Sequence, residues 1–129
     1  MNRKVPKALK LHKRSKDLEL SYVDATGHEE SYRVSCELLR VCSPSAEVRG
    51  HGKPIMQTGK KHVLITAMET VGNYAIKLVF DDGHDSGLYD WGYLYDLCTN
   101  QESHWEEYLR QLHAAGESRD PQASVVRLV

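Results

Sequence analysis

Hydrophobic and polar residues alternate along the first third of the chain, which is the pattern of strands with one buried face. The alternation is clear over residues 9–12, 18–22 and 32–34. Asp24-Ala25-Thr26-Gly27 lies between the last two stretches and has the residue types of a turn. The sequence therefore predicts a first strand followed by a β-hairpin over residues 18–34.

A short helix and an irregular segment interrupt this pattern. Ser35 is placed to cap a helix over residues 36–40, because its hydroxyl can accept a hydrogen bond from a free N–H group of the first turn. Ser43-Pro44 is a second helix-start signal. Residues 49–61 contain three glycines and a proline, so we expect a loop or an irregular edge strand there.

Strand patterns return in the second half of the chain. Residues 62–68 are rich in β-branched and apolar side chains, and residues 74–80 alternate regularly. Val71-Gly72-Asn73 predicts a turn between them, and we expect this pair of strands at the centre of the sheet. A polar loop over residues 81–87 then leads into Leu88-Tyr89.

Two helices are predicted after these strands. Asp90 is placed to cap the first, whose apolar residues recur at helical spacing from Trp91 to Cys98. Ser103 and Glu106 have the spacing of a capping box for the last helix, within residues 99–115. One apolar stripe follows the last helix: Trp105, Tyr108, Leu109 and Leu112. We expect a flexible tail over residues 116–129.

Together these elements predict an α+β fold: a small, mostly antiparallel β-sheet with short inserted helices and C-terminal helices packed on one side. The 129 residues, 40% hydrophobic and 27% charged, suit one domain with one core. No apolar run approaches the roughly 20 residues that span a bilayer, and no apolar segment of a secretory signal follows the N-terminus. Three cysteines are too few for a disulfide framework. We therefore expect a cytoplasmic protein with no membrane partner.

The net charge of −1 hides a strongly basic N-terminal arm. Residues 1–16, which include the first strand, hold seven of the seventeen Lys and Arg residues and none of the eighteen acidic ones. Nucleic-acid binding would therefore rest on this arm alone. The favoured interpretation is that these charges are solvated and flank the first strand, which makes a nucleic-acid partner an unfavoured alternative.

Carboxylates and an imidazole crowd the loop before the first C-terminal helix: Asp81, Asp82, His84, Asp85 and Asp90. Such a cluster suits a metal or acid–base chemistry. The alternative is structural, because aspartates in a loop between a strand and a helix commonly make Asx turns and caps. The spacing does not match an EF-hand calcium loop.

The thiols do not have the spacing of a common metal or redox site. Cys36 and Cys42 form no C-x-x-C pair, and Cys98 on an apolar helix face has the character of a small buried hydrophobe. A site with Cys42 and His84 has two protein ligands in view, whereas a closed zinc site needs four. Nucleophile-elbow, phosphate-loop and dinucleotide motifs are absent from the sequence.

Five segments in a fixed order carry a resemblance to a known family. They are Pro6 through Leu11, Leu18-Glu19-Leu20, Leu39-Arg40 with Ser43 through Glu47, Val71 through Ile76, and Phe80 through Trp91 with Leu94. This set resembles the DUF971 family, the domain similar to the N-terminal domain of gamma-butyrobetaine hydroxylase, over residues 6–98. No single segment is decisive, but their order and spacing together are specific.

The resemblance implies a structural zinc held by three closely spaced cysteines after a Leu-Arg pair and by a later histidine. Leu39-Arg40 and His84 are retained here. An ungapped alignment places the cysteine positions at Ser43, Ser45 and Val48, with Cys42 one position before the first. Zinc or iron would therefore need His84 and Cys42 together with other groups.

The resemblance does not carry over oxygenase activity, because that chemistry belongs to a separate, larger iron-binding domain. Members of the family also occur fused to scaffold ATPases of the Mrp/ApbC type, which assemble iron–sulphur clusters. The resemblance thus implies an accessory role in iron–sulphur or other metal-cofactor biogenesis. We hypothesise a non-enzymatic binding or adaptor domain that needs no cofactor and binds a protein, with such an ATPase as a candidate partner.

The hypothetical binding surface comprises six residues around the family segments: Arg40, Asn73, Tyr74, Asp82, His84 and Trp91. Tyr74 and Trp91 have an equally simple alternative as core aromatics. If Arg40 and His84 line one accessible patch, recognition is favoured; if Arg40 pairs with Asp82 across the fold, the motif is structural. The other open hypotheses are a zinc- or iron-binding protein that uses His84 and Cys42, and nucleic-acid contact through residues 1–16.

Overall fold

The structure is a computed structural model that describes residues 5–45 and 56–121. These residues form two three-stranded antiparallel sheets and three helices, so the α+β class is confirmed, although the strands form two sheets instead of the single one expected. The strands are β1 (Ala8–His12), β2 (Asp17–Val23), β3 (Glu29–Ser35), β4 (Ile65–Val71), β5 (Ala75–Phe80) and β6 (Leu88–Asp90). The helices are α1 (Cys36–Val41), α3 (Trp91–Thr99) and α4 (Gln101–Ala115).

The first sheet has the order β1-β2-β3 and contains the expected hairpin. Its register places Leu9 and Tyr32 on either side of Leu20, so their side chains share one face of the sheet. The Asp24 carboxylate closes the turn, accepting hydrogen bonds from the Thr26 N–H at 2.9 Å and its hydroxyl at 2.6 Å. The alternation in the sequence thus corresponds to one buried face.

The second sheet has the order β4-β5-β6, with β5 in the middle. Inward-facing side chains of β5 are fully buried: Ile76, Leu78 and Phe80. The strand expected over residues 62–68 begins only at Ile65. The residues before it form a turn in which the Val63 N–H donates to the Lys60 carbonyl at 3.1 Å, and this turn delays the start of β4.

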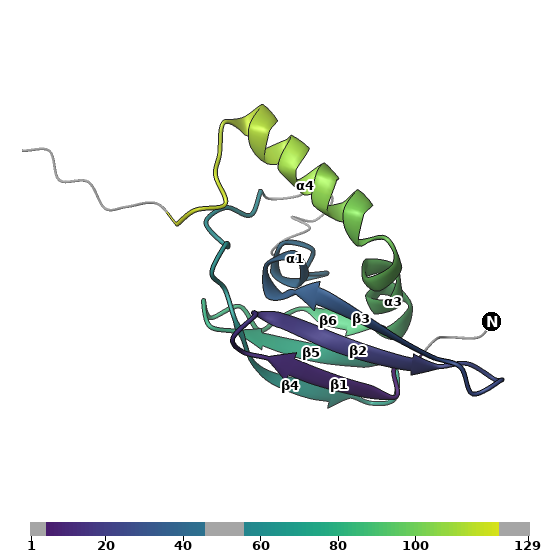
Figure 1. Ribbon diagram of the computed structural model, residues 1–129. Helices are drawn as coiled ribbons and strands as arrows, with labels where there is room; N and C mark the ends of the chain where they lie inside the picture. The colour runs from purple at the N-terminus through teal and green to yellow at the C-terminus, as the bar shows by residue number, and fades with distance from the viewer. Residues whose placement is uncertain (1–4, 46–55, 122–129) are drawn as a thin grey trace, which may run out of the picture.

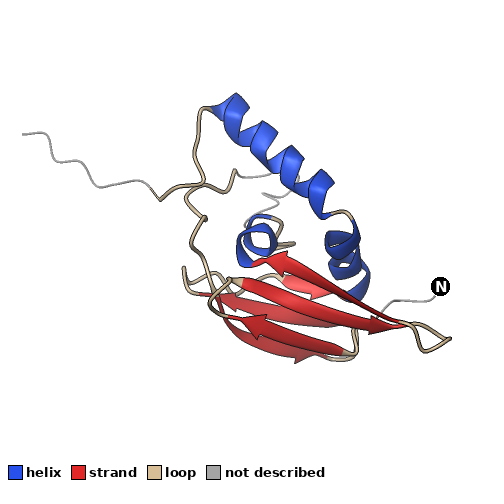
Figure 2. Ribbon diagram, in the orientation of Figure 1, coloured by secondary structure: helices blue, strands red, loops and turns tan. Residues whose placement is uncertain are grey.

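The two sheets bury their apolar faces in one hydrophobic core, and the helices cover one side of the strands (Figures 1 and 2). Buried core residues of the two sheets include Leu18, Leu20, Tyr22 and Val34 from the first and Ile65, Ile76, Leu78, Phe80 and Tyr89 from the second. Helix α1 lies between α4 and the strands (Figure 1). This arrangement brings the β3–α1 connection close to the C-terminal helix.

Two helix starts have the predicted caps. The Ser35 hydroxyl accepts a hydrogen bond from the Leu38 N–H at 3.0 Å and caps α1. The Asp90 carboxylate accepts one from the Tyr93 N–H at 2.8 Å and caps α3. Both expectations are confirmed.

The start of α4 differs from the expectation. Asn100 is the single residue between α3 and α4, and its side-chain amide donates to the Asp96 carboxylate of α3 at 2.6 Å instead of capping α4. Helix α4 begins directly after Asn100, so Ser103 lies inside the helix. The predicted capping box of Ser103 and Glu106 is therefore wrong, because the short joint starts the helix earlier.

Residues 117–121 pack against the loop that precedes β4. The Gly59 N–H donates to the Ser118 carbonyl at 3.1 Å, and the Lys61 N–H donates to the Arg119 carbonyl at 3.0 Å. The tail expected from residue 116 onward therefore has a partner in its first part. Residues 122–129 lie outside the part of the chain that the structure describes.

Several expectations fall wholly or partly outside the described residues. They concern residues 1–4 of the basic arm, the helix start at Ser43-Pro44, residues 49–55 of the irregular segment, and Val48. Within residues 5–45 and 56–121, no helix has the length and apolar character needed to cross a membrane.

A core truncation tests the packing of the two sheets. Leu20→Ala removes a side chain that is 0% exposed, and we expect it to lower the free energy of unfolding by about 2–5 kcal/mol. Val23→Thr, at the 42% exposed end of the same strand, is the matched control and should change it by less than about 0.5 kcal/mol. Urea denaturation measures both, and equal effects would contradict the assignment of Leu20 to the core.

Candidate functional site

The side chain of Arg40, on α1, crosses to the loop after β5. It is 8% exposed, and its Nε donates to the Asp82 carboxylate at 2.8 Å. A second guanidinium nitrogen donates to the Gln57 side-chain oxygen at 3.0 Å, and Lys60 Nζ lies 2.6 Å from the same Asp82 oxygen as Arg40. The sequence hypothesis offered two roles for Arg40, and this pairing across the fold is the structural one.

His84 forms a second buried polar contact beside the first. Its Nε2 lies 2.8 Å from the Ser43 hydroxyl and 3.4 Å from the Ser45 hydroxyl, and all three residues are buried. A methyl group at Gly87 would lie 2.3 Å from the Ser43 oxygen, so glycine there leaves room for this contact. The Phe80 N–H donates to the His84 carbonyl at 2.9 Å and closes the loop around it.

The Asp82 carboxyl is held in its charged form. Partial burial by itself raises its pKa, but hydrogen bonds from Lys60, from the His84 N–H and from Arg40 outweigh burial and lower the pKa to about 2. The bond from the His84 N–H, 3.1 Å long, is the Asx turn that the structural interpretation of this loop predicts. Asp81 likewise accepts from the Leu64 N–H at 3.1 Å.

The residues around His84 do not fit the zinc site that the resemblance implies. Hydroxyls of Ser43 and Ser45 face the imidazole where the implied zinc site has thiolates, and a neutral hydroxyl is not among the usual zinc ligands. Burial raises the pKa of the Cys42 thiol to about 11, so this thiol is protonated at neutral pH. No group of three or more His, Cys, Asp or Glu residues suited to a metal occurs in the described chain, so Cys42 and His84 do not form one there.

The six residues of the hypothetical binding surface do not form one accessible face. Arg40, His84 and Trp91 are buried, whereas Tyr74 is 45% exposed. The Trp91 indole N–H donates to the Asn73 carbonyl at 2.9 Å, which makes Trp91 a core aromatic that anchors the β4–β5 turn. The buried three are turned inward because each has an intramolecular hydrogen-bond partner. Solvent reaches Asn73, Tyr74 and part of the Asp82 side chain, which is 22% exposed.

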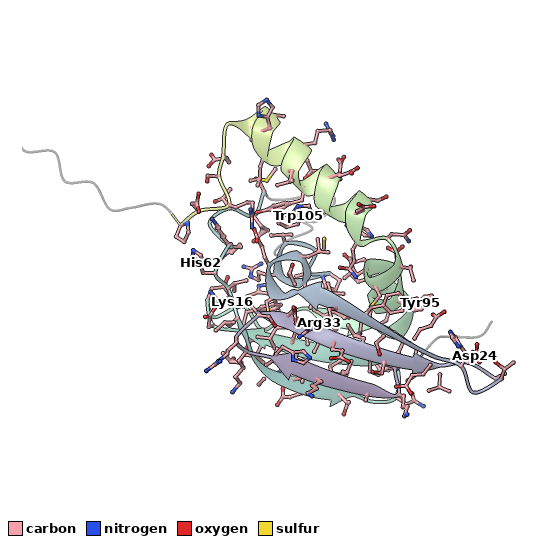
Figure 3. The ribbon with its side chains drawn as sticks, viewed as in Figure 1. Lys16, Asp24, Arg33, His62, Tyr95 and Trp105 are labelled. Carbon is pink, nitrogen blue, oxygen red and sulfur yellow. The ribbon has the colours of Figure 1, made fainter. Side chains whose placement is uncertain are left out.

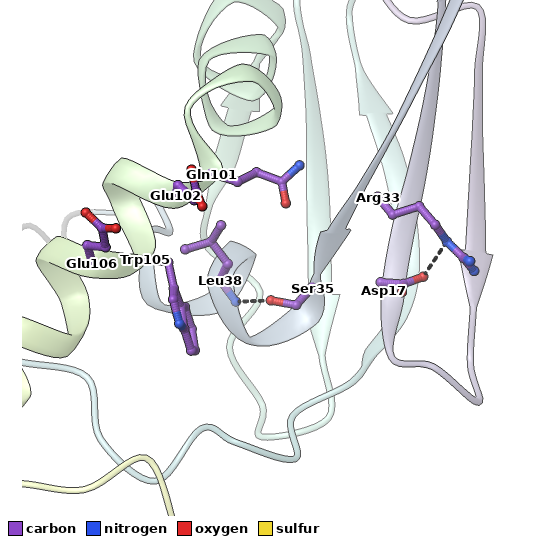
Figure 4. A pocket seen from close by; sticks show the side chains of 8 residues that line it. All are labelled: Asp17, Arg33, Ser35, Leu38, Gln101, Glu102, Trp105 and Glu106. Atoms are coloured by element: carbon purple, nitrogen blue, oxygen red, sulfur yellow. Dashed lines mark hydrogen bonds and ion pairs between the residues drawn. The ribbon is translucent and has the colours of Figure 1, made fainter.

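A surface cavity of about 460 Å³ lies elsewhere, between the first sheet, α1 and α4 (Figure 4). Its lining comprises Asp17, Arg33, Ser35, Leu38, Gln101, Glu102, Trp105 and Glu106. Figure 4 shows the two glutamates on consecutive turns of α4, with the Trp105 ring and Leu38 below them. A volume of this size is within the range of small-ligand sites, about 300–1,000 Å³.

Trp105, which Figures 3 and 4 label, lines this cavity and is in contact with Arg119. The Arg119 guanidinium lies over its ring, 4.8 Å from the centroid. The same guanidinium donates to both carboxylate oxygens of buried Glu37, at 2.7 and 2.8 Å. The segment after α4 thus connects α1 to the cavity wall.

Sequence reasoning did not predict this cavity. It assigned Trp105 to an apolar stripe of the last helix, and Tyr108 and Leu112 of that stripe are indeed buried while Leu109 is 38% exposed. The signal available in the sequence is the pair Glu102 and Glu106, four residues apart and flanking Trp105. Nothing in the sequence shows that α1 and the first sheet lie opposite this helix face.

The Asp82 ion pair predicts a specific dependence of stability on pH. The Asp82 pKa is lower in the folded chain than in the unfolded chain, so its contribution is complete above about pH 4 and disappears as pH falls toward 2. We expect Asp82→Asn to be less stable than the wild type at pH 7, with the difference shrinking steadily between about pH 4 and pH 2. Urea unfolding at several pH values measures this; a difference independent of pH would contradict it. Glu69→Gln, which removes an exposed partner of Lys77, is the control.

The comparisons with known proteins agree with this fold. The family model described as "Gamma-butyrobetaine hydroxylase-like, N-terminal" matches residues 9–95. No curated protein matches the chain. Two NMR solution structures each share 51% sequence identity with it and cover 98% of it, with TM-scores of 0.80 and 0.77; the match covers 98% and 92% of their own chains.

A crystal structure from Acidithiobacillus ferrooxidans ATCC 23270 is also similar, at 35% identity and a TM-score of 0.57, covering 71% of this chain and 90% of its own. It is described as a protein of unknown function that belongs to the DUF971 family. The family match spans most of the two sheets and α3, including Arg40, Asp82 and His84. The chain therefore belongs to the gamma-butyrobetaine hydroxylase-like N-terminal (DUF971) family.

Proposed function

We propose that this chain is a non-enzymatic protein-binding module, accessory to the assembly of iron–sulphur clusters or other metal cofactors. The observation that supports binding most directly is the 460 Å³ cavity between the first sheet, α1 and α4, with half-buried Trp105 in its wall. Aromatic side chains in hollows of this kind are the usual anchors of protein interfaces.

Two residues of the family segments, Arg40 and His84, are buried, and their burial supports the same proposal. Arg40 and His84 are the residues of the family segments whose side chains are best suited to catalysis or ligand binding. Both side chains form hydrogen bonds with other parts of the chain. The Cys42 and Cys98 thiols have pKa values raised to about 11, chiefly by burial, which disfavours nucleophilic roles. In this proposal the motif maintains the fold, and recognition takes place at the surface.

The proposed partner is a scaffold ATPase of the Mrp/ApbC type, in the cytoplasm. This choice rests on the occurrence of family members fused to such ATPases, since fusion commonly joins proteins that act together. Recognition of the ATPase by this domain would need an interface between the two. The cavity offers a candidate for the centre of that interface.

Binding to the ATPase tests the proposal directly. We expect isothermal titration of the purified chain into an Mrp/ApbC-type ATPase to show saturable binding, weakened at least about tenfold by Trp105→Ala. Tyr74→Ala is the matched control, because Tyr74 is an exposed aromatic outside the cavity, and it should change the affinity less than about twofold. Charge reversal by Glu102→Arg, at an exposed position, provides a second cavity variant that does not alter the core.

The outcomes of this titration show whether the ATPase binds at the cavity or at the exposed Asn73–Tyr74 turn. No binding by the wild type would overturn the choice of partner. Binding weakened by Tyr74→Ala and not by either cavity variant would place recognition at the exposed Asn73–Tyr74 turn instead of the cavity. Thermal unfolding of each variant checks that it is folded at the assay temperature.

Metal content tests the rival metal-binding hypothesis. The serine hydroxyls on His84 and the high pKa of the Cys42 thiol lead us to expect far less than one zinc or iron per chain in tag-free protein purified anaerobically. His84→Ala should have the same low content, and Ser43→Ala is the control that keeps the imidazole. About one metal per chain in the wild type, lost in His84→Ala, would contradict the proposal that the motif is structural.

A further inference from the structure

Some of the polar groups that line the cavity already have ion-pair or hydrogen-bond partners within the chain. Arg33 pairs with Asp17 at 3.2 Å, and the Ser35 hydroxyl caps α1. The Gln101 side-chain amide donates to the Cys98 carbonyl at 3.0 Å. The charges and donors on these sides of the cavity are therefore largely satisfied within the chain.

Glu102 and Glu106 remain without an ion-pair or hydrogen-bond partner among residues 5–45 and 56–121. Both are exposed and stand one turn apart on α4, so their carboxylates repel each other. Figure 4 shows both at the rim of the cavity on the side of Trp105. Because the Asp17 charge is offset by Arg33, the uncompensated charge of the cavity is negative.

The apolar part of the cavity lies beside these carboxylates. Leu38 and Trp105 line it, and the indole ring of Trp105 already carries one guanidinium, that of Arg119, at 4.8 Å from its centroid. An arginine side chain combines an apolar stem with a planar cation. The stem suits the apolar side chains of Leu38 and Trp105, and the cation suits the carboxylates beside them. The pairing of Arg119 with Trp105 and Glu37 shows the same chemistry within the chain.

We propose that the cavity binds an arginine side chain presented by a segment of the partner protein. The guanidinium lies between the Glu102 and Glu106 carboxylates, and the aliphatic stem packs on Trp105 and Leu38. The volume of about 460 Å³ leaves room for an apolar neighbour of that arginine. This inference rests on the proposed function and specifies the chemistry that the partner must present.

Titration of a capped tripeptide, Leu-Arg-Leu, against the ¹⁵N-labelled full chain tests the inference. We expect saturable shifts of the Trp105 indole N–H resonance and of amides in α4, and no shift of the Trp91 indole, which is bonded to the Asn73 carbonyl. The same peptide with glutamine in place of arginine should produce no saturable shift. Raising the salt concentration should weaken the binding, because the carboxylates are exposed.

Two double variants distinguish the effect of the Glu102 and Glu106 carboxylates on peptide binding from the effect of net charge. Glu102→Gln with Glu106→Gln should weaken peptide binding about tenfold, whereas Glu69→Gln with Glu107→Gln, on β4 and on α4 outside the cavity lining, should change it less than about twofold. Equal weakening by both pairs would overturn the inference, because it would show attraction by net charge alone. Saturable binding of the glutamine peptide would also overturn it.

The peptide experiment and the ATPase experiment test different proposals, and each can contradict its own proposal without contradicting the other. If the ATPase binds and Trp105→Ala weakens that binding, but the arginine peptide produces no saturable shift, the arginine inference is wrong and the binding module stands. If the peptide binds as described and the ATPase does not, the cavity chemistry is supported and the choice of partner is wrong.

Discussion

The end of α1 contacts the loop after β5 through two buried polar interactions. Helix α1 continues directly from the first sheet, whereas Asp82 and His84 follow the middle strand of the second. The Arg40–Asp82 ion pair and the Ser43–His84 hydrogen bond therefore join two sheets that share no strand. Since a buried charge without a partner costs several kcal/mol, this contact favours one placement of the sheets about the core.

The same short helix also organises the surface. Glu37, one turn before Arg40, receives Arg119 from the segment after α4, and Arg119 covers the Trp105 ring. Leu38, between them in sequence, faces the cavity. The internal polar contacts and the candidate binding surface thus involve positions 37–40 of one helix, so a change that displaces α1 is expected to disturb both stability and recognition.

Ser43, Ser45 and His84 form a buried hydrogen-bonded cluster at the place where the resemblance implies a zinc site. Ser43 and Ser45 stand where the resemblance implies cysteines, and their hydroxyls face the imidazole. A net hydrogen bond contributes only about 1 kcal/mol, far less than a structural zinc. The Arg40–Asp82 pair, with a second cation from Lys60, is a further connection between α1 and the second sheet.

The first strand, the hairpin with its turn at Asp24, the caps at Ser35 and Asp90 and the family follow from the sequence, because alternation, turn chemistry and capping act over a few neighbouring residues, although the pattern placed the start of β4 three residues early and did not predict β6. Local signals predicted one sheet because they do not say which strands pair, and they placed a cap at Ser103 because they missed the one-residue joint at Asn100. The division into two sheets, the inward direction of Arg40 and His84, and the place of Trp105 in a cavity wall are visible only in three dimensions. These outcomes depend on which segments pack together, such as Arg40 with a carboxylate 42 positions away, and neither spacing nor composition encodes that distance.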